Sequence, residues 1–297
     1  MYLSKCAYSG FKTVLRIILV AVVLLASTSL AVGAGTACSK KAKSFSILMD
    51  SAPEGTDSFT YWAVEELNDD EDLREIYSRF RESSDAEQLR ELVQVLAIVK
   101  DSARISSSDN TGVLKEPVTV LRADLDRQWV EDRLNALGYS RSEYGDADIW
   151  IAGEGQVYRP VALLSGTILI GNVSDLKVCI NTRKHNDQSL RDDPHIEVLT
   201  SRLPKGLVVH IERAAASSVS YVDLVAYGKS YSKIKKTLMK MTAVYVFSDG
   251  PSAEDALQQI KDNLKVAVQE VKASRDGNLV VATAQISITN FAQSLEF

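Results

Sequence analysis

The chain has 297 residues, of which 45% are hydrophobic and 25% charged, and its formal net charge is -5. This composition is that of a folded chain of one or two domains, and it excludes a disordered acidic tail, a collagen-like repeat and a multi-span membrane protein. Three cysteines exclude a disulfide-rich scaffold. No catalytic signature in the sequence identifies an activity.

The first 37 residues have the parts of an export signal. They contain Lys5, Lys12 and Arg16 and no acidic residue, and residues 17–39 are uncharged. Residues 17–26 are continuously apolar, and small residues follow at 31–37. A basic start, an apolar core and a small-residue end are typical of a secretory signal peptide, so we expect residues 1–37 to be removed and the rest exported.

The residues at the end of this signal, together with Cys38, favour a lipid anchor. Gly35-Thr36-Ala37-Cys38 resembles the lipobox of exported bacterial lipoproteins, although Gly35 stands where that pattern usually has an aliphatic residue. The resemblance implies cleavage before Cys38 and lipidation of Cys38, with residues 38–55 as a tether. Two alternatives stay open: an uncleaved anchor helix, since about 20 apolar residues span a bilayer, and ordinary cleavage that leaves Cys38 free.

The part of the chain after residue 37 has a larger negative charge than the whole chain, and it contains two of the three cysteines. Loss of residues 1–37 removes three of the 34 basic residues and none of the 39 acidic ones, which takes the net charge to -8. Such a balance argues against a nucleic-acid partner, because phosphate binding needs excess Lys and Arg. Cys6 leaves with the signal, and Cys179 lies in an apolar stretch that predicts a small buried hydrophobe.

The stretch from residue 45 to residue 116 is predicted to be mostly helical. Residues 45–50 suit a short strand or the end of the tether, and residues 56–104 suit a helical segment. Ser84 and Glu87 have the spacing of a capping box, and apolar residues follow them at helical intervals. The polar residues 105–116 are predicted to be a linker.

Residues 117–200 are predicted to form an α+β region. We expect strands at 118–121, 147–158, 163–169 and 173–180, a helix at 124–137 that ends at Gly138, and a loop at 181–194.

Residues 205–297 are predicted to form a second α+β region, continuous or not with the first. Strands are expected at 207–213 and 218–227, followed by a helix with Tyr231, Ile234, Leu238 and Met241 on one face. A longer helix is expected to open at Asp249, with proline in its first turn, and an alternating strand at 279–289. The predicted fold class is α+β, with mixed or antiparallel sheets covered by amphipathic helices after an N-terminal helical segment.

Three stretches of the sequence contain residue types found in binding sites. His185, His195 and nearby acids share one stretch, but their spacing matches no zinc motif, so a solvated loop is the favoured interpretation and no metal or cofactor is expected. Gly153-Glu154-Gly155 lacks the following helix that a dinucleotide-binding loop requires. A group of lysines on the expected short helix favours a solvated face, with contact to an anionic surface as the alternative. These lysines are Lys229, Lys233, Lys235, Lys236 and Lys240.

One stretch resembles a known family. Ala147, Asp148 and Gly153 match the strand that follows the first helix in envelope lipoproteins of the CsgG and LpoB type. The resemblance covers about 60 residues and implies an adaptor or assembly role without catalysis. The function expected is therefore a non-enzymatic, lipid-anchored envelope protein that binds or scaffolds other envelope proteins. The alternatives are a solute-binding lipoprotein that serves a transporter, and a hydrolase without a recognisable motif.

Overall fold

The computed structural model describes residues 43–74, 99–107, 113–124, 126–154, 158–217 and 219–293. Its contacts divide the chain into two units, residues 1–43 and 44–297. The elements described below belong to the second unit. Both regions predicted as α+β, 117–200 and 205–297, contribute strands to one sheet in this unit.

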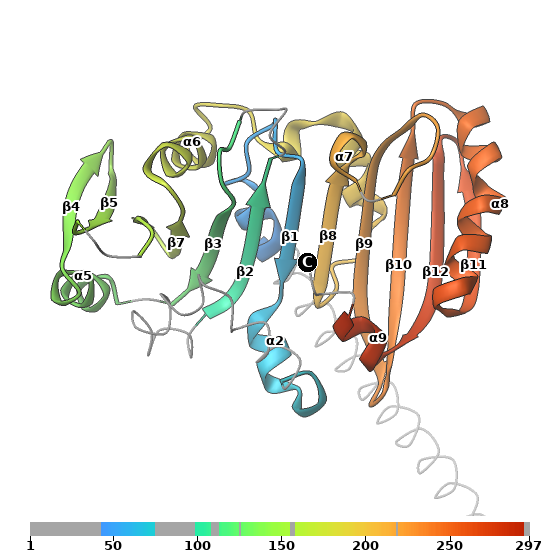
Figure 1. Cartoon of the computed structure of the whole chain (residues 1–297), viewed down its shortest axis with the longest axis horizontal. Helices are drawn as coiled ribbons and strands as arrows, with labels where there is room; N and C mark the ends of the chain where they lie inside the picture. Colours follow the sequence, from blue (N-terminus) through green and yellow to red (C-terminus); the bar gives the residue numbers. More distant parts are fainter. Residues whose placement is uncertain are drawn as a thin grey trace, which may run out of the picture. The chain divides into compact units, whose positions relative to one another are not determined.

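Twelve strands of the described residues form a single antiparallel sheet (Figure 1). Their order is β11-β12-β10-β9-β8-β1-β2-β3-β7-β6-β5-β4. The strands are β1 (Ser58–Trp62), β2 (Val99–Ser106), β3 (Val118–Ala123), β4 (Tyr139–Tyr144), β5 (Ala147–Ala152), β6 (Val161–Leu164), β7 (Thr167–Ile170), β8 (Val208–Arg213), β9 (Leu224–Lys235), β10 (Leu238–Phe247), β11 (Gln269–Asp276) and β12 (Leu279–Ser287).

The fold class predicted from the sequence is wrong. The prediction had mixed or antiparallel sheets covered by helices, after an N-terminal helical segment, whereas the described residues form a mostly-sheet fold built on one antiparallel sheet. The physical reason is hydrogen bonding between segments that are far apart in the chain. Strand β1 pairs with β8 across about half of the sequence, and this pairing joins the two regions into one sheet.

The same order of elements occurs on both sides of the β1–β8 pair. On one side, β1, β2 and β3 form a meander, α5 (Arg127–Ala136) follows, and β4 returns as the last strand. On the other side, β8, β9 and β10 form a meander, α8 (Gly250–Ala267) follows, and β11 is the last strand. Thr60 and His210 are the central pair of the β1–β8 register, so they lie at the middle of this arrangement.

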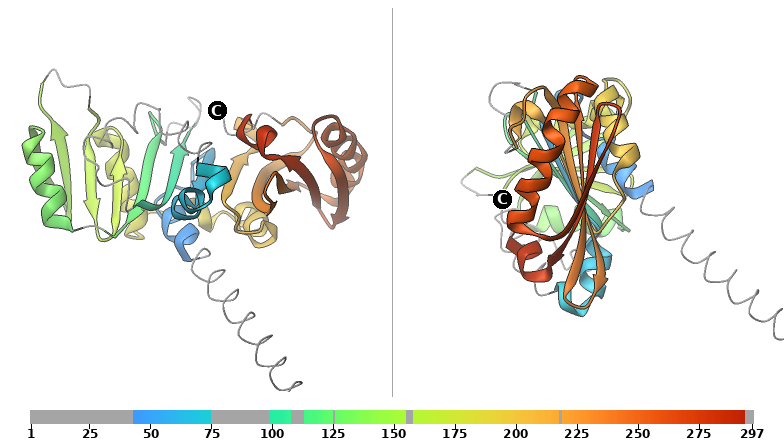
Figure 2. Two further views of the ribbon diagram at one scale, coloured as in Figure 1. Left: turned by 90° about the horizontal axis from the view of Figure 1, so that it is seen from below. Right: turned by 90° about the vertical axis from the view of Figure 1, so that its right-hand side faces the viewer.

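Helices pack on both faces of the sheet, as Figure 2 shows in its right-hand view, with α8 on one side and the yellow helices on the other. The first face carries a core that contains Trp62 of β1 and Leu134 of α5. This face also holds α2 (Val64–Asp69), α8 and α9 (Ile288–Gln293). The second face carries a core that contains Phe59 of β1, and it holds α6 (Val173–Arg183), the short helix η2 (Leu190–Asp192) and α7 (Pro194–Arg202).

The segment at the start of the described chain also packs on the second face. Residues 43–49 are helical, where a short strand or a tether was expected. Phe45, Leu48, Met49 and Ala52 are almost fully buried. Their spacing of three, one and three residues is that of one helical face, which packs against the sheet.

Several elements agree with the sequence analysis. The helix expected at 124–137 is α5, and the helix expected after Asp249 is α8. The strands expected at 118–121 and 207–213 are β3 and β8. The alternating strand expected at 279–289 is β12, and its last residues belong to α9 instead.

Other elements were predicted wrongly. The strand expected at 173–180 is helix α6, whose start is capped by Asn172, since its side-chain oxygen accepts a hydrogen bond from the Asp175 amide at 2.9 Å. The loop expected at 181–194 contains η2, and it is followed by α7. The expected helical segment 56–104 contains β1, α2 and β2, while Ser84 and Glu87 lie outside the described residues.

The short lysine-bearing helix expected after residue 227 is the β9–β10 hairpin. The adjacent residues Ala226 and Tyr227 are buried on opposite faces of the sheet, which is the two-residue period of a strand. No helix among the described residues is both long and apolar enough to span a bilayer.

Candidate functional site

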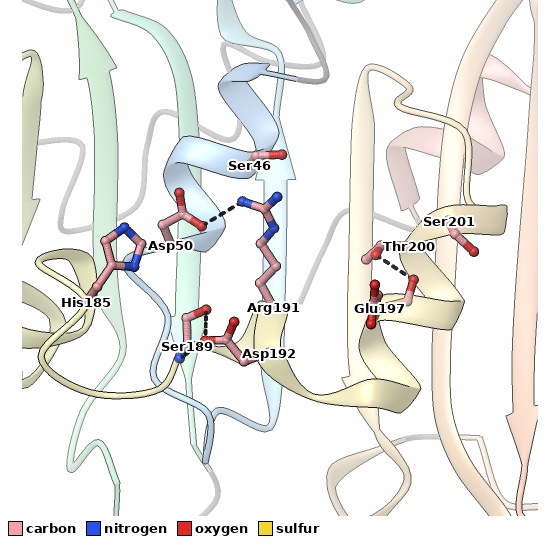
Figure 3. Close-up of a pocket in the computed structure, with 9 residues that line it drawn as sticks. All are labelled: Ser46, Asp50, His185, Ser189, Arg191, Asp192, Glu197, Thr200 and Ser201. Carbon is pink, nitrogen blue, oxygen red and sulfur yellow. Dashed lines mark hydrogen bonds and ion pairs between the residues drawn. The ribbon is translucent and has the colours of Figure 1, made fainter.

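A polar pocket lies on the second face between residues 43–50, the α6–η2 loop, η2 and α7 (Figure 3). We call it the Arg191 pocket. Its volume is about 550 Å³. The lining side chains are all polar or charged: Ser46, Asp50, His185, Ser189, Arg191, Asp192, Glu197, Thr200 and Ser201. Such a lining suits a ligand with polar or charged groups.

Local capping interactions fix the wall formed by residues 189–193. The Asp192 carboxylate accepts hydrogen bonds from the Ser189 amide at 2.8 Å and the Ser189 hydroxyl at 2.9 Å. These bonds, with smaller contributions from the charges of Arg191 and His185, lower the pKa of Asp192. Asp193 caps α7, with Pro194 at the first helical position. Two successive caps therefore hold the backbone that carries Arg191.

Arg191 connects the two walls of the pocket. Its Nη1 atom lies 3.2 Å from the Asp50 carboxylate, and 56% of its side chain is exposed. An ion pair with this exposure contributes little to stability because water screens it. The guanidinium therefore stays accessible to a second anion.

Lys205 lies next to the pocket and is held in one place. Its ammonium group lies 3.9 Å from the centre of the Phe45 ring and donates a hydrogen bond to the Thr200 carbonyl at 3.2 Å. Burial, and to a smaller extent the charge of Arg191, lower the pKa of Lys205 to about 8. Lys205 therefore lies beside the pocket wall that contains Thr200.

Arginines also fasten the 43–57 segment to the rest of the unit. Arg183 donates hydrogen bonds to the Ile47 carbonyl and the Ser51 hydroxyl, both at 3.1 Å. Arg213 donates to the Thr56 carbonyl at 3.1 Å and forms an ion pair with Asp193 at 2.7 Å. The pocket wall that contains Ser46 and Asp50 is therefore part of the folded unit.

A second polar grouping lies on the first face, and we call it the His210 network. Nδ1 of His210 lies 2.7 Å from the Thr60 hydroxyl, and its Nε2 lies 2.7 Å from the Glu212 carboxylate. Ser217 donates to the other Glu212 oxygen at 2.9 Å. The hydrogen bond from His210, Ser217 and nearby positive charges lower the pKa of Glu212, although burial acts in the opposite direction and is the largest single influence.

The order of groups in the His210 network resembles a hydroxyl nucleophile, a base and an orienting acid. However, Thr60 is only 6% exposed and His210 only 4% exposed. A substrate cannot reach the Thr60 hydroxyl in this conformation. The arrangement therefore suits a network that satisfies buried polar atoms.

The structure disperses the five lysines that the sequence placed together. Lys229 is half-buried on the first face, where burial lowers its pKa and Glu212 acts against this shift. Lys233 forms ion pairs with Asp70 and Asp72, at 2.5 and 2.8 Å. Lys235, Lys236 and Lys240 are exposed near the turn of the β9–β10 hairpin. Contact with an anionic surface stays a prediction for these three.

The other sequence candidates have simple structural environments. Cys179 is fully buried in α6, and burial raises the pKa of its thiol to about 12, which opposes thiolate chemistry. His185 lines the Arg191 pocket, while His195 lies in the first turn of α7. Within the described part of the chain, no group of three His, Cys, Asp or Glu residues has metal-binding geometry. Cys38 lies outside the described residues.

Asp50, Arg191 and Lys205 were not among the site residues predicted from the sequence. Ser189 and Asp192 have a capping spacing, and Asp193-Pro194 is a helix-start signal, so α7 could have been found. The pocket itself could not, because its walls are about 140 residues apart in the chain.

Comparison with known proteins gives one distant relation. No family model and no curated protein matches the chain. A crystal structure of TP0453 matches with a TM-score of 0.53 and 11% sequence identity, over 84% of this chain and 96% of that one. At this identity the match shows a shared fold.

Proposed function

We propose that this chain is a non-enzymatic binding protein of the cell envelope, held to a membrane through lipidated Cys38. The signal in residues 1–37 supports export, and the sequence Gly35-Thr36-Ala37-Cys38 supports lipidation of Cys38.

One structural observation carries the proposal: the folded unit starts very soon after Cys38. Helix 43–49 is buried and fastened by Arg183 and Lys205, so only residues 39–42 separate it from Cys38. A chain of four or five residues extends to no more than about 18 Å. Such a short connection suits a protein that works at a membrane surface.

The antiparallel sheet supports binding of another protein in preference to the architecture of a two-lobed solute-binding protein. The strands pair antiparallel throughout the described residues, whereas the solute-binding proteins considered above would have two lobes built on parallel sheets. Strands β4 and β11 each pair on one side among those residues. An edge of this kind can accept a strand from another protein.

A labelled fatty acid tests the anchor. We expect the protein expressed in a bacterial host to incorporate the label, and Cys38→Ala to lose it. The matched controls are Cys6→Ala and Cys179→Ala, which should keep the label because one residue lies in the signal and the other is buried. Equal label in Cys38→Ala and the natural chain would contradict the proposal.

A solute-binding role is the second candidate, and the Arg191 pocket favours it. The pocket is a single concave polar surface of about 550 Å³ with charges of both signs. This volume is within the range of small-molecule sites. The two roles are compatible, since an anchored protein can hold a solute near a membrane.

A further inference from the structure

We propose that the Arg191 pocket binds a small zwitterion, with an ammonium group at one end and a carboxylate or phosphate at the other. This inference rests on the solute-binding role given above as the second candidate. It is carried by the separation of charge along the pocket. In Figure 3 the Arg191 side chain runs between the walls, with its guanidinium directed toward Ser46 and with Asp192 and Glu197 nearer its base.

The guanidinium end is suited to an anion. Arg191 has one carboxylate partner, Asp50, and more than half of its side chain is exposed. A guanidinium group can hold a carboxylate or phosphate through two parallel N–H donors.

The opposite end is suited to an ammonium group. One oxygen of Asp192 accepts both bonds from Ser189, which leaves the other oxygen available to a ligand. Glu197 lines the pocket and forms no ion pair with any described residue. Either carboxylate can accept a hydrogen bond from an ammonium group, which has three N–H donors.

The rest of the lining sets the size and chemistry of the ligand. The hydroxyls of Ser46, Thr200 and Ser201 provide neutral hydrogen-bonding groups on both walls. Because every lining side chain is polar or charged, the pocket favours a polar ligand over a long acyl chain. A dipeptide and an ethanolamine phosphate both fit this description, and they represent two sources of the same chemistry.

Calorimetric titration of the purified full-length protein in detergent tests the inference. The probes are glycylglycine and phosphoethanolamine, with acetate, inorganic phosphate and ethanolamine as single-charge controls. We expect at least one zwitterion to bind at least ten times more tightly than every single-charge probe. Tighter binding of glycylglycine would identify a peptide-like ligand, and tighter binding of phosphoethanolamine a phosphate ester.

Variants locate the binding to the two ends of the pocket. Arg191→Gln and Glu197→Gln should each weaken binding of the zwitterion at least tenfold, because each removes one charged partner. Arg202→Gln is the matched control, since Arg202 is an exposed arginine of α7 that pairs with Asp276 outside the pocket. Circular dichroism confirms that each variant is folded.

Three results would overturn the inference: no zwitterion binds, a single-charge probe binds as tightly, or Arg191→Gln and Glu197→Gln bind like the natural chain. These results leave the fatty-acid label on Cys38 unchanged. Failure of the zwitterion site is therefore distinguishable from failure of the proposed anchor.

Discussion

The Arg191 pocket and the His210 network use similar residue types on opposite faces of one sheet, but burial separates them. In the network, Thr60 and His210 are almost inaccessible and the polar atoms satisfy one another. In the pocket, Arg191 is exposed, and its partner Asp50 and the other polar side chains line an open space. Buried polar groups must be paired within the protein, whereas exposed ones can exchange a partner for a ligand. The network is therefore expected to contribute to stability and the pocket to binding.

The largest expected effect tests whether the pocket wall belongs to the folded unit. Leu48 is fully buried on the helix that carries Ser46 and Asp50. Leu48→Ala should lower the free energy of unfolding by about 3 kcal/mol, because it removes apolar contacts and leaves a cavity. Urea denaturation measures the change, and exposed Lys43→Ala serves as the control. An effect of Leu48→Ala no larger than that of Lys43→Ala would mean that this segment is a loose tether.

The next effect concerns the His210 network. His210→Ala leaves Thr60 and Glu212 without their histidine partner in a buried place, which should cost about 2 kcal/mol of stability. The same variant should bind zwitterions normally, because it does not touch the Arg191 pocket. Thermal unfolding and calorimetry on one sample provide both values. If His210→Ala lost affinity for zwitterions and kept its stability, the His210 network would be a binding site and not a stabilising network.

A smaller effect concerns pH. The pKa of Lys205 is about 8 in the folded chain, compared with 10.5 for an ordinary lysine. Between these pH values the unfolded chain binds more protons at Lys205, so its contribution makes the folded state more stable as pH rises from 8 to 10.5. Below pH 8 the cost of burying the charge is fully present.

Lys205→Met should remove this contribution. Its free energy of unfolding should rise less between pH 8 and pH 10 than that of the natural chain, as measured by urea denaturation. Lys236→Met, on the exposed hairpin turn, should keep the natural pH dependence. An identical pH dependence in Lys205→Met and the natural chain would show that Lys205 is not buried in solution.

The smallest effect is expected at the pocket ion pair. Asp50→Asn should change stability by less than about 1 kcal/mol, since the Asp50–Arg191 pair is partly exposed to water. Its melting temperature should therefore remain close to that of the natural chain. A loss as large as that of Leu48→Ala would show that the pair is structural.

Local patterns in the sequence predicted some helices and strands correctly and others wrongly. The helices α5 and α8 and the strand β12 were predictable because their apolar residues repeat at a clear period. Residues 173–180 were mistaken for a strand, since a short apolar run is compatible with both structures, and the Asn172 cap decides for the helix. The lysine-bearing hairpin was mistaken for a helix because Tyr231, Ile234, Leu238 and Met241 also fit a helical period.

Long-range pairing was beyond the sequence analysis. The single sheet depends on β1 pairing with β8, and neither strand carries a local mark of its partner. The Arg191 pocket depends on another long-range pairing, because the Pro53–Ser189 bridge joins the segments that carry Asp50 and Arg191. The His210 network likewise requires Thr60 and His210 to meet across 150 residues.

The most direct test of the proposed function is the intact mass of the protein purified from bacterial membranes. The account predicts a chain that begins at Cys38 and carries the added mass of acyl groups on that residue. A chain that retains residues 1–37, or one that begins near Cys38 without acyl groups, would contradict the lipid anchor.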